Sequence, residues 1–331
     1  KIINLYMNGG DFVKKALIVG IDEYPDAPLK GCINDANAVA ELLRTNGDGS
    51  PNFDVSLKLN VKTKAEFLDL IEDLFSGDAD ASLLYFSGHG SEAGHLVTPD
   101  YRGKDLGVLM TEVLGCANNS KCKNKIIILD CCYSGKFGES STTQSNESIL
   151  GEGVTIMTAS SRDQVSMEHG GQGVFTNLFL QSLRGSAADI TGKITPAGIY
   201  SFIDQSLWAW QQRPIFKTNI SQFISIRDIE PRVPKSVLRK LGKYFNSPSD
   251  EVKLDPSFEF TNNPNYKHEV IEPYAKDENV KKFKELQLFE SVGLIEPVDE
   301  EHMYFAAMHS KSCKLTALGL HYWKLAKDTR F

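Results

Sequence analysis

Two short segments of the chain combine residue types that can carry out nucleophilic catalysis. Residues 85–90 (YFSGHG) hold His89 between two glycines, and residues 130–135 (DCCYSG) place Cys131 and Cys132 directly after an acid. A free thiol is only a few per cent ionised at neutral pH, so a nucleophilic cysteine needs a neighbouring base or cation, and imidazole can be either. The two segments therefore indicate a cysteine hydrolase, provided that the fold brings them together.

Each segment follows an apolar run, which predicts where it lies in the fold. Residues 81–87 and 125–131 have the short apolar pattern of buried strands, and both motifs lie where these strands end. In a parallel sheet, reactive groups gather beyond the carboxyl ends of the strands. We expect the sulfur and the imidazole to meet there if the two strands are neighbours.

The wider pattern alternates strands with helices. Strands are expected at residues 16–21, 55–60, 81–87, 125–131 and 153–160. Helices are expected at residues 34–47, 63–75, 175–185 and 195–211. Asn34 or Asp35 can cap the first helix and Gly47 can end it, while Thr63 can cap the second helix. This alternation predicts an α/β protein with a mainly parallel central sheet.

Changes in composition divide the rest of the chain. Residues 136–152 are polar and rich in Ser, Thr and Gly, which predicts a mobile loop. The prolines of residues 230–237 predict a domain boundary, and the stretch from 230 to 275 reads as an irregular linker. Residues 276–331 show a helix, a short strand, a hairpin arm over 302–316 and a closing helix, which predicts a small α+β module of winged-helix-like type.

Composition and charge exclude several classes of function. Hydrophobic residues make up 41% and charged residues 24% of the 331 residues, as in an ordinary globular protein. The net charge of −7 offers no basic surface to nucleic acid, and from 279 to 331 eight Lys and Arg stand against seven Asp and Glu. No apolar run approaches the roughly 20 residues of a membrane helix, and the start is too short and polar for a signal peptide. We expect a cytoplasmic protein without a membrane or nucleic-acid partner.

The six cysteines show no pattern of a disulfide framework. Cys116 and Cys122 could pair or bind a metal, but no second pair with ligand spacing accompanies them. Ordinary reduced thiols are the simpler interpretation, with Cys32 and Cys313 as small packing residues.

Together, the two motifs resemble those of the caspase-like clan of cysteine peptidases, peptidase family C14, and specifically its metacaspase and orthocaspase branch. Residues 16–43 are similar to the opening of the family's large-subunit region, and residues 158–185 are similar to its small-subunit region. His89 lies 43 residues before Cys132, close to the spacing of about 50 found in caspases. The resemblance covers about residues 14–228.

The resemblance implies a caspase-like α/β/α sandwich for residues 1–229. A large-subunit-like part would span 14–135 and a small-subunit-like part 153–228, joined by the loop 136–152. It also implies a bacterial protein. In bacteria, caspase-like peptidases fused to small modules resemble effectors of stress or anti-phage responses, which is a further expectation for this chain.

The family motif assigns a role to each residue of the two segments. The order Asp, any residue, Cys makes Cys132 the nucleophile, and Cys131 at the variable position should face the other side of an alternating strand. Tyr133 stands where metacaspases usually carry His. His89 would act as base and acid, and the main-chain N–H groups of Gly90 and Cys132 would form an oxyanion hole.

The same resemblance assigns Asp35, Asp130 and Ser87 to the first specificity pocket. Caspases, which cut after Asp, hold Arg and Gln at the positions of the two acids. Two carboxylates in a partly enclosed pocket repel each other and favour a cation. We therefore expect a protein or peptide substrate with Arg or Lys before the scissile bond, and Arg is favoured through its bidentate fork. Taken alone, Asp35 reads better as a helix N-cap.

No cofactor is expected from the sequence. Many metacaspases need calcium, and hard cations take six or more oxygen ligands. Residues 91–112 offer only separated acids, namely Glu92, Asp100, Asp105 and Glu112. We therefore expect no dedicated metal site.

Self-cleavage after Arg or Lys would find few sites in the loop, because residues 136–152 contain one basic residue, Lys136. We expect a single-chain monomer. Residues 230–331 would then control it as a latch or as the dock of a regulatory or sensor protein.

Two other functions are considered beside the peptidase. A catalytically silent caspase-like scaffold would act through its carboxy-terminal module, although such variants typically lose Cys132 or His89. A regulator that binds DNA through residues 276–331 is disfavoured by the near-neutral charge of that segment.

Overall fold

The structure is a computed structural model that describes most of the chain. The described residues are 13–131, 149–159, 168–169, 172–207, 214–221, 223–266 and 269–331. They fall into two compact units that divide after Glu230, here called unit 1 and unit 2. The nucleophile expected at Cys132 and most of the mobile loop expected at 136–152 lie outside the described residues.

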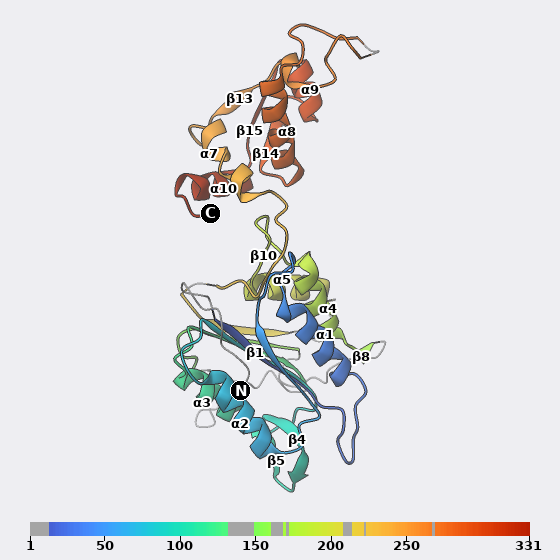
Figure 1. The fold of residues 1–331 in the computed structure, drawn as a ribbon, viewed down its shortest axis with the longest axis vertical. Coiled ribbons are helices and arrows are strands. Elements are labelled where there is room, and N and C mark those ends of the chain that lie inside the picture. The colour runs from blue at the N-terminus through green and yellow to red at the C-terminus, as the bar shows by residue number, and fades with distance from the viewer. Residues whose placement is uncertain are drawn as a thin grey trace. The chain divides into compact units, whose positions relative to one another are not determined.

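Unit 1 is built on a six-stranded sheet with the strand order β11-β7-β6-β3-β1-β2. The strands are β1 (Lys14–Gly20), β2 (Asp54–Leu59), β3 (Ala81–Ser87), β6 (Asn124–Asp130), β7 (Val154–Thr158) and β11 (Ile215–Asn219). All neighbours run parallel except β11, which pairs antiparallel with β7. The strands expected from the apolar runs are present, and the mainly parallel central sheet is confirmed (Figure 1).

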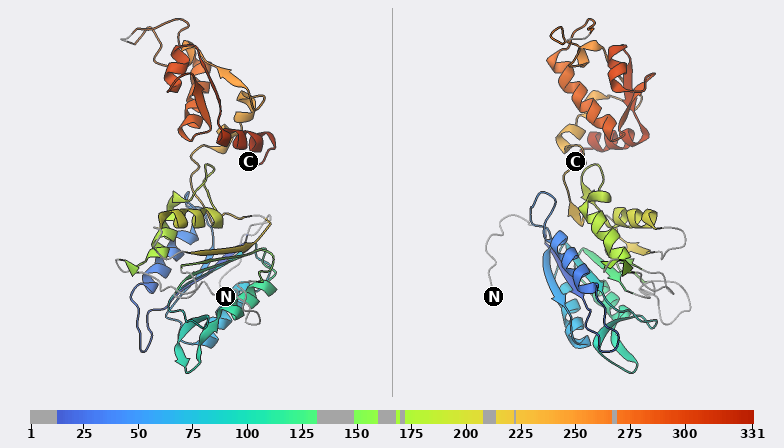
Figure 2. Two further views of the ribbon diagram at one scale, coloured as in Figure 1. Left: turned by 180° about the vertical axis from the view of Figure 1, so that it is seen from behind. Right: turned by 90° about the vertical axis from the view of Figure 1, so that its right-hand side faces the viewer.

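Helices cover both faces of this sheet (Figure 1; Figure 2). One face carries α1 (Cys32–Arg44), α4 (Val174–Gln181) and α5 (Pro196–Ser206), and a π-type turn, η2 (Ser182–Ser186), continues α4. The other face carries α2 (Lys64–Phe75) and α3 (Met110–Asn119). The expected α/β/α sandwich is therefore confirmed. Among the described residues, no helix combines the length and the apolar character that crossing a membrane demands.

Alternation along the strands sorts their side chains between the two faces of the sheet. On β3, Leu83 and Tyr85 join the core beneath α1 and α4, whereas Leu84 and Phe86 join the core beneath α2 and α3. Full burial of side chains of this size stabilises the fold by about 1.5–3 kcal/mol each. The same alternation places Ser87, at the end of β3, on the face of α1 and α4.

The first helix begins earlier than the sequence predicts, and a distant residue caps it. Helix α1 begins at Cys32, so neither Asn34 nor Asp35 is its N-cap. Instead, the carboxylate of Asp22, just after β1, accepts the main-chain N–H groups of Cys32 and Ile33 at 3.0 and 3.3 Å. The interpretation of Asp35 as a helix cap is wrong, because Asp22 already satisfies these donors.

The end of α1 also differs from the prediction, because the helix ends at Arg44 rather than at Gly47. The starts of two other helices follow local chemistry. The side chain of Thr63 accepts the N–H of Glu66 at 3.2 Å, which confirms the predicted cap of α2. Thr195 caps α5 in the same way.

The described part of unit 1 also holds small two-stranded sheets that the sequence did not predict. They are β4 (His95–Arg102) with β5 (Asp105–Leu109), β8 (Glu168–His169) with β9 (Gln172–Gly173), and β10 (Lys193–Ile194) with β12 (Arg227–Asp228). The first of them follows His89 in the chain, and the second ends where α4 begins.

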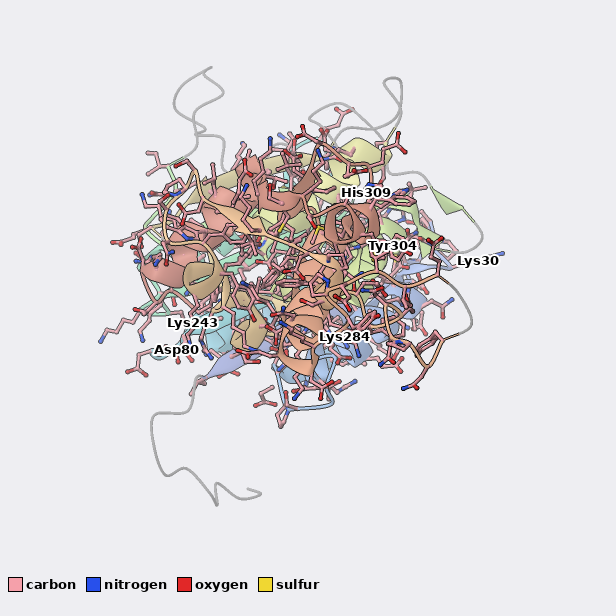
Figure 3. All side chains as sticks on the ribbon, turned by 90° about the horizontal axis from the view of Figure 1, so that it is seen from above. Lys30, Asp80, Lys243, Lys284, Tyr304 and His309 are labelled. Atoms are coloured by element: carbon pink, nitrogen blue, oxygen red, sulfur yellow. The ribbon has the colours of Figure 1, made fainter. Side chains whose placement is uncertain are left out.

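Unit 2 is a small α+β unit around a three-stranded antiparallel sheet in the order β13-β15-β14. The strands are β13 (Glu251–Lys253), β14 (Ile295–Val298) and β15 (Ser312–Leu315). The helices are α6 (Lys235–Leu238), α7 (Leu241–Tyr244), η3 (Pro256–Phe258), α8 (Asp277–Ser291), α9 (Met303–Met308) and α10 (Ala317–Lys327). Lys284, Tyr304 and His309 lie on the outside of this unit (Figure 3).

Two expectations for this part of the chain are wrong. The stretch expected as a linker up to 275 contributes α6, α7 and β13 to the folded unit, because β13 pairs with β15. The hairpin arm expected over 302–316 is interrupted by α9, because Met303, Ala306 and Ala307 turn into the core at helical spacing. Helix α9 thus interrupts the hairpin on which the winged-helix expectation rested.

Candidate active site

The carboxyl ends of β3 and β6 meet at one edge of the sheet. The two strands are parallel neighbours, and their register pairs Ser87 with Asp130. The N–H of Gly88 donates to the carbonyl of Asp130 at 3.4 Å, so the two chains stay together beyond this pair. His89 and Cys131 follow directly. The strands that carry the two motifs are therefore neighbours, as a meeting of sulfur and imidazole requires.

The first of the two adjacent cysteines lies in the core. Cys131 is 1% exposed and belongs to the cluster beneath α2 and α3. Asp130, one residue earlier, contacts Thr176 of α4 on the opposite face of the sheet. Because Cys131 is closed to a substrate, the motif leaves Cys132, outside the described residues, as the candidate nucleophile.

His89 is half-buried and is held through its main chain and its ring. Its N–H donates to the hydroxyl of Tyr24 at 3.0 Å, and its carbonyl accepts the N–H of Val97 at 2.9 Å. The imidazole meets the Tyr24 ring edge to face, with 4.6 Å between the ring centroids. The Tyr24 hydroxyl in turn donates to the carbonyl of Val97 at 3.3 Å. One buried tyrosine therefore ties the histidine to β4.

A hydrogen bond at Nε2 determines which ring nitrogen of His89 carries the hydrogen. Nε2 lies 2.7 Å from the carbonyl oxygen of Ala27, which can only accept a hydrogen bond. Nε2 must therefore carry the hydrogen, and the neutral ring keeps its lone pair on Nδ1. This arrangement suits a general base. No feature of the sequence indicates that Ala27 takes part in it.

Gly88 and Gly90, which flank His89, have different structural roles. A Cβ on Gly88 would lie 2.6 Å from the Tyr24 hydroxyl, so only glycine lets this hydroxyl approach the backbone. Gly90 pairs with Leu96 in an isolated antiparallel bridge. Two hydrogen bonds flank this pair: the N–H of Val97 donates to the carbonyl of His89, and the N–H of Ser91 donates to the carbonyl of His95. Gly90 is thus at a non-hydrogen-bonded position of the ladder, where the N–H points away from the partner strand. That direction is compatible with the expected oxyanion hole.

The three residues expected to select the substrate lie close together under α1 and α4. Asp35 is 2% exposed, Asp130 is 6% exposed and Ser87 is 2% exposed. The Ser87 hydroxyl donates to Asp35 Oδ2 at 3.5 Å, and the N–H of Gly173 donates to the same oxygen at 3.3 Å. A Cβ on Gly173 would lie 2.3 Å from Asp130 Oδ2. Both carboxylates therefore flank the backbone of Gly173, and a side chain there would collide with one of them.

Thr176, in the first turn of α4, is a partner of the acid pair that the sequence did not reveal. Its hydroxyl donates to Asp130 Oδ2 at 2.6 Å, and the hydroxyl of Tyr85 lies 2.5 Å from the Thr176 oxygen. Because Thr176 gives its hydrogen to Asp130, Tyr85 donates to Thr176. Burial raises the pKa of Tyr85, and the nearby carboxylates Asp130 and Asp35 raise it further. Tyr85 therefore stays a neutral donor at this end of the network.

Cys32 borders the acid pair but is not a second nucleophile. It is 6% exposed, and burial raises its pKa, while its hydrogen bonding with Ser87 acts in the opposite direction. The neighbouring acids Asp22, Asp130 and Asp35 raise the pKa further. The thiol therefore remains neutral, which agrees with the expected packing role. The free cysteines among the described residues are Cys32, Cys116, Cys122, Cys131 and Cys313.

Three of the four acids considered as calcium ligands, Asp100, Asp105 and Glu112, gather around Lys64. The N–H of Lys64 donates to both oxygens of Asp100 at 3.1 and 3.2 Å. The ammonium of Lys64 lies 3.3 Å from Asp105 and 3.8 Å from Glu112. Within the described ranges, no three His, Cys, Asp or Glu side chains are grouped so that they could hold a metal ion.

Comparison with known proteins gives a family and similar solved structures. Residues 13–202, more than half of the chain, match the family model Peptidase_C14, the caspase domain. The crystal structure of caspase-1 from Spodoptera frugiperda is similar at 16% sequence identity, covering 69% of this chain and 98% of that chain, with a TM-score of 0.49. A search of curated proteins found no match. The matched residues include both motifs and the acid pair.

Proposed function

Because this chain belongs to the caspase-domain family of peptidases, we propose that it is a cysteine endopeptidase that cleaves proteins after Arg or Lys. Cys132 is the nucleophile and His89 is the base and acid. The proposal is carried by one observation, namely that Asp35 and Asp130 flank Gly173 at the sheet edge where β3 and β6 lead into the two motifs. This charge pattern belongs to the metacaspase branch rather than to enzymes that cut after Asp.

The chemistry follows from these groups in two steps. Nδ1 of His89 takes the thiol proton of Cys132, and the thiolate attacks the carbonyl carbon of the scissile peptide. The N–H groups of Gly90 and Cys132 stabilise the oxyanion, and collapse of the tetrahedral intermediate expels the amine, which takes its proton from His89. Water then hydrolyses the thioester with His89 as base, and the free thiol is restored.

Specificity follows from the electrostatics of two buried carboxylates. Moving such charges out of water carries a penalty of several kcal/mol per ion unless a partner compensates for it. A guanidinium can compensate for both Asp35 and Asp130 and can form two parallel hydrogen bonds with a carboxylate. A substrate Asp would add a third negative charge to the same place. We therefore expect Arg to be preferred over Lys, and Asp to be rejected.

A panel of fluorogenic peptides that differ only in the residue before the scissile bond tests this proposal. The full chain is assayed with Arg, Lys and Asp at that position, with and without calcium, beside Cys132→Ala. We expect cleavage after Arg and Lys only, and none by Cys132→Ala. Cleavage only after Asp would refute the pocket assignment. If every peptide stays intact, labelling by an Arg-based covalent inhibitor distinguishes an enzyme that lacks its activator from a catalytically silent scaffold.

The acid pair is tested by removing the charge of one of its members. Asp130→Asn loses a charge-assisted hydrogen bond to the substrate of about 1.5–3 kcal/mol, so kcat/KM for the Arg peptide should fall about 10- to 100-fold. Asp54→Asn, at an exposed acid that begins β2, is the matched control and should keep wild-type kcat/KM. An equal fall in both variants would remove the acid pair from the specificity pocket.

We further propose how the enzyme is deployed. It works as a single-chain monomer without a cofactor in the cytoplasm, and unit 2 docks a regulatory or sensor protein. The five free cysteines among the described residues fit a reducing compartment. In a bacterium, such a protease would serve as a regulated effector of a stress or anti-phage response.

A further inference from the structure

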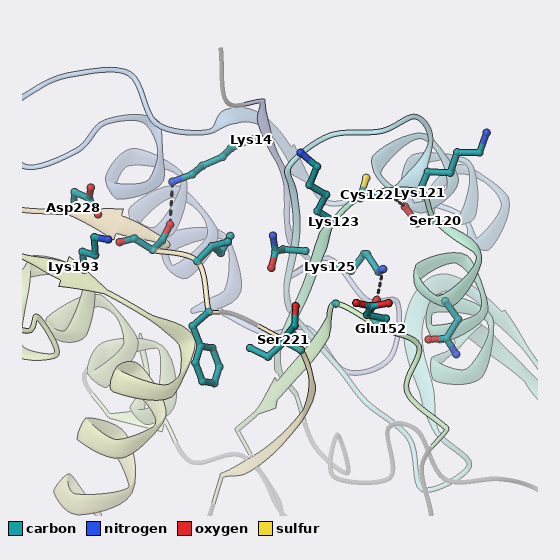
Figure 4. Close-up of a pocket in the computed structure, with 17 residues that line it drawn as sticks. Lys14, Ser120, Lys121, Cys122, Lys123, Lys125, Glu152, Lys193, Ser221 and Asp228 are labelled. Carbon is teal, nitrogen blue, oxygen red and sulfur yellow. Dashed lines mark hydrogen bonds between the residues drawn. The ribbon is translucent and has the colours of Figure 1, made fainter. Parts of the chain in front are cut away.

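A large cavity lies at the amino edge of the sheet in unit 1, opposite the candidate active site. Its volume is about 910 Å³, within the size range of small-molecule sites. Its lining includes Lys14 (Figure 4), which begins β1, and Asn124, which begins β6. The carboxyl ends of these parallel strands point the other way, toward the motifs of the candidate active site. The cavity is therefore a separate place on the same sheet.

Lysines from several segments surround this cavity. They are Lys14, Lys121, Lys123, Lys125 and Lys193. The lining also contains two carboxylates, Glu152 and Asp228, so five ammonium groups stand against two acids and leave three positive charges. Lys123 is paired with Asp80 at 2.7 Å, which reduces the excess to two. In a chain with a net charge of −7, a local positive excess of this kind favours an anionic ligand.

Two of these ammonium groups, those of Lys14 and Lys125, are partly buried and donate to neutral carbonyl acceptors. Lys125 is 5% exposed, and its Nζ donates to the main-chain carbonyl of Glu152 at 2.5 Å (Figure 4). The Nζ of Lys14 donates to the side-chain carbonyl of Asn52 at 3.0 Å and to the main-chain carbonyl of Ser225 at 2.9 Å. Burial lowers the pKa of both lysines, while nearby acids act in the opposite direction. A bound anion would favour their charged forms.

Part of the cavity wall is apolar. Ile220, Phe223 and Ile224 contribute to the lining, and Phe223 is 37% exposed. An exposed aromatic ring in the lining can stack against a flat ring of the ligand. The lining thus combines cationic and aromatic groups.

We propose that this cavity binds a nucleoside phosphate. The phosphates lie along the lysine-bearing part of the lining, where ammonium groups act as point-charge partners. The base lies against Phe223. The proposal is independent of proteolysis, because none of these residues belongs to the candidate active site.

Calorimetric titration of the full chain tests the ligand class. The probes are ATP, inorganic pyrophosphate and adenosine at one fixed ionic strength. We expect one ATP to bind per chain, pyrophosphate to bind at least tenfold more weakly, and adenosine to bind more weakly still. Equal affinity for ATP and pyrophosphate would overturn the role of the aromatic wall, and the absence of binding by both would overturn the site itself.

A double variant at the rim of the cavity tests whether ATP binds there. Lys121 and Lys193 are exposed and lie at opposite ends of the cavity (Figure 4), so the Lys121→Ala/Lys193→Ala variant should fold normally while it loses the exposed cation at either end. We expect its affinity for ATP to fall at least tenfold. Lys104→Ala, at an exposed lysine in the turn between β4 and β5, is the matched control and should bind ATP as the wild type does. Wild-type affinity in the double variant would place the anion elsewhere and overturn the proposal.

Discussion

Replacing Tyr24 with Phe removes one buried hydroxyl that ties the His89 segment to β4. This hydroxyl accepts the N–H of His89 at 3.0 Å and donates to the carbonyl of Val97 at 3.3 Å, and Tyr24 is 4% exposed. Phe keeps the aromatic ring, whose centroid lies 4.6 Å from that of the imidazole. The variant therefore separates the effect of the hydroxyl from the effect of the packing.

The size of the effect follows from the two main-chain groups that lose their partner. A buried group left without a hydrogen bond lowers stability by about 1–3 kcal/mol. The bond at 3.3 Å is long, so its loss should count at the low end of this range. We expect Tyr24→Phe to lower the free energy of unfolding by about 2–4 kcal/mol. Since the histidine main chain is then held by fewer bonds, kcat should fall about tenfold with little change in KM, as expected for a misplaced acid-base group.

Urea unfolding and steady-state cleavage of an Arg peptide measure the two effects. Tyr101→Phe is the matched control, because the Tyr101 hydroxyl donates to an exposed carboxylate, Asp26, and leaves no buried group behind. We expect this control to match the wild type within about 0.5 kcal/mol. Wild-type kcat in Tyr24→Phe would refute the argument that this hydroxyl positions His89, whatever happens to stability.

Three further predictions address the acid pair, the first helix and the pH dependence of stability. Gly173→Ala places a Cβ 2.3 Å from Asp130 Oδ2, so kcat/KM for an Arg peptide should fall at least tenfold, whereas Gly115→Ala, whose Cβ meets nothing within 4 Å, should leave it unchanged. Asp22→Ala removes the acceptor of two N–H groups at the start of α1, and urea titration should show a loss of about 1–2 kcal/mol; an unchanged midpoint would contradict the cap. The pKa of Cys32 is raised by burial above its ordinary value of 9.0, so above this pH the unfolded thiol ionises and the folded thiol does not. Stability should therefore fall as the pH rises beyond 9, by up to about 1.4 kcal/mol per pH unit from this group, and Cys32→Ala should show a smaller fall in urea titrations at pH 9 and 10; an equal fall would contradict this assignment.

Local patterns in the sequence were enough to predict the five parallel strands of the sheet, though not the antiparallel edge strand β11, and the edge at which the motifs meet. The apolar runs that became β3 and β6 are short and continuous because both strands are covered by helices on both faces. Because the carboxyl ends of parallel strands lie at the same edge of a sheet, His89 and Asp130 could be assigned to one edge from the sequence. Thr63 was predicted as a cap because its partner, Glu66, lies only three residues away.

Contacts between distant residues could not be predicted in the same way. The cap of α1 comes from Asp22, ten residues before the helix begins, and no local rule selects it over Asn34 or Asp35. Thr176 carries no sequence signal beyond its place near the start of a helix, and its role depends on a strand 46 residues away in the chain. Helix α9 was mistaken for a hairpin arm because six residues are too short a run to separate helical from alternating spacing.

The cap and the specificity pocket are linked through one helix. Asp22 fixes the start of α1, and the first turn of α1 carries Asp35 to the hydroxyl of Ser87 and the N–H of Gly173. Weakening this end of the helix should therefore displace Asp35, and Asp22→Ala should reduce the preference for Arg as well as the stability. Thr63→Ala removes a cap from α2 on the opposite face and should lower stability by a similar amount, about 1 kcal/mol, while the preference for Arg stays unchanged. Equal effects on the preference for Arg in the two variants would show that stability alone is responsible and that α1 does not orient the acid.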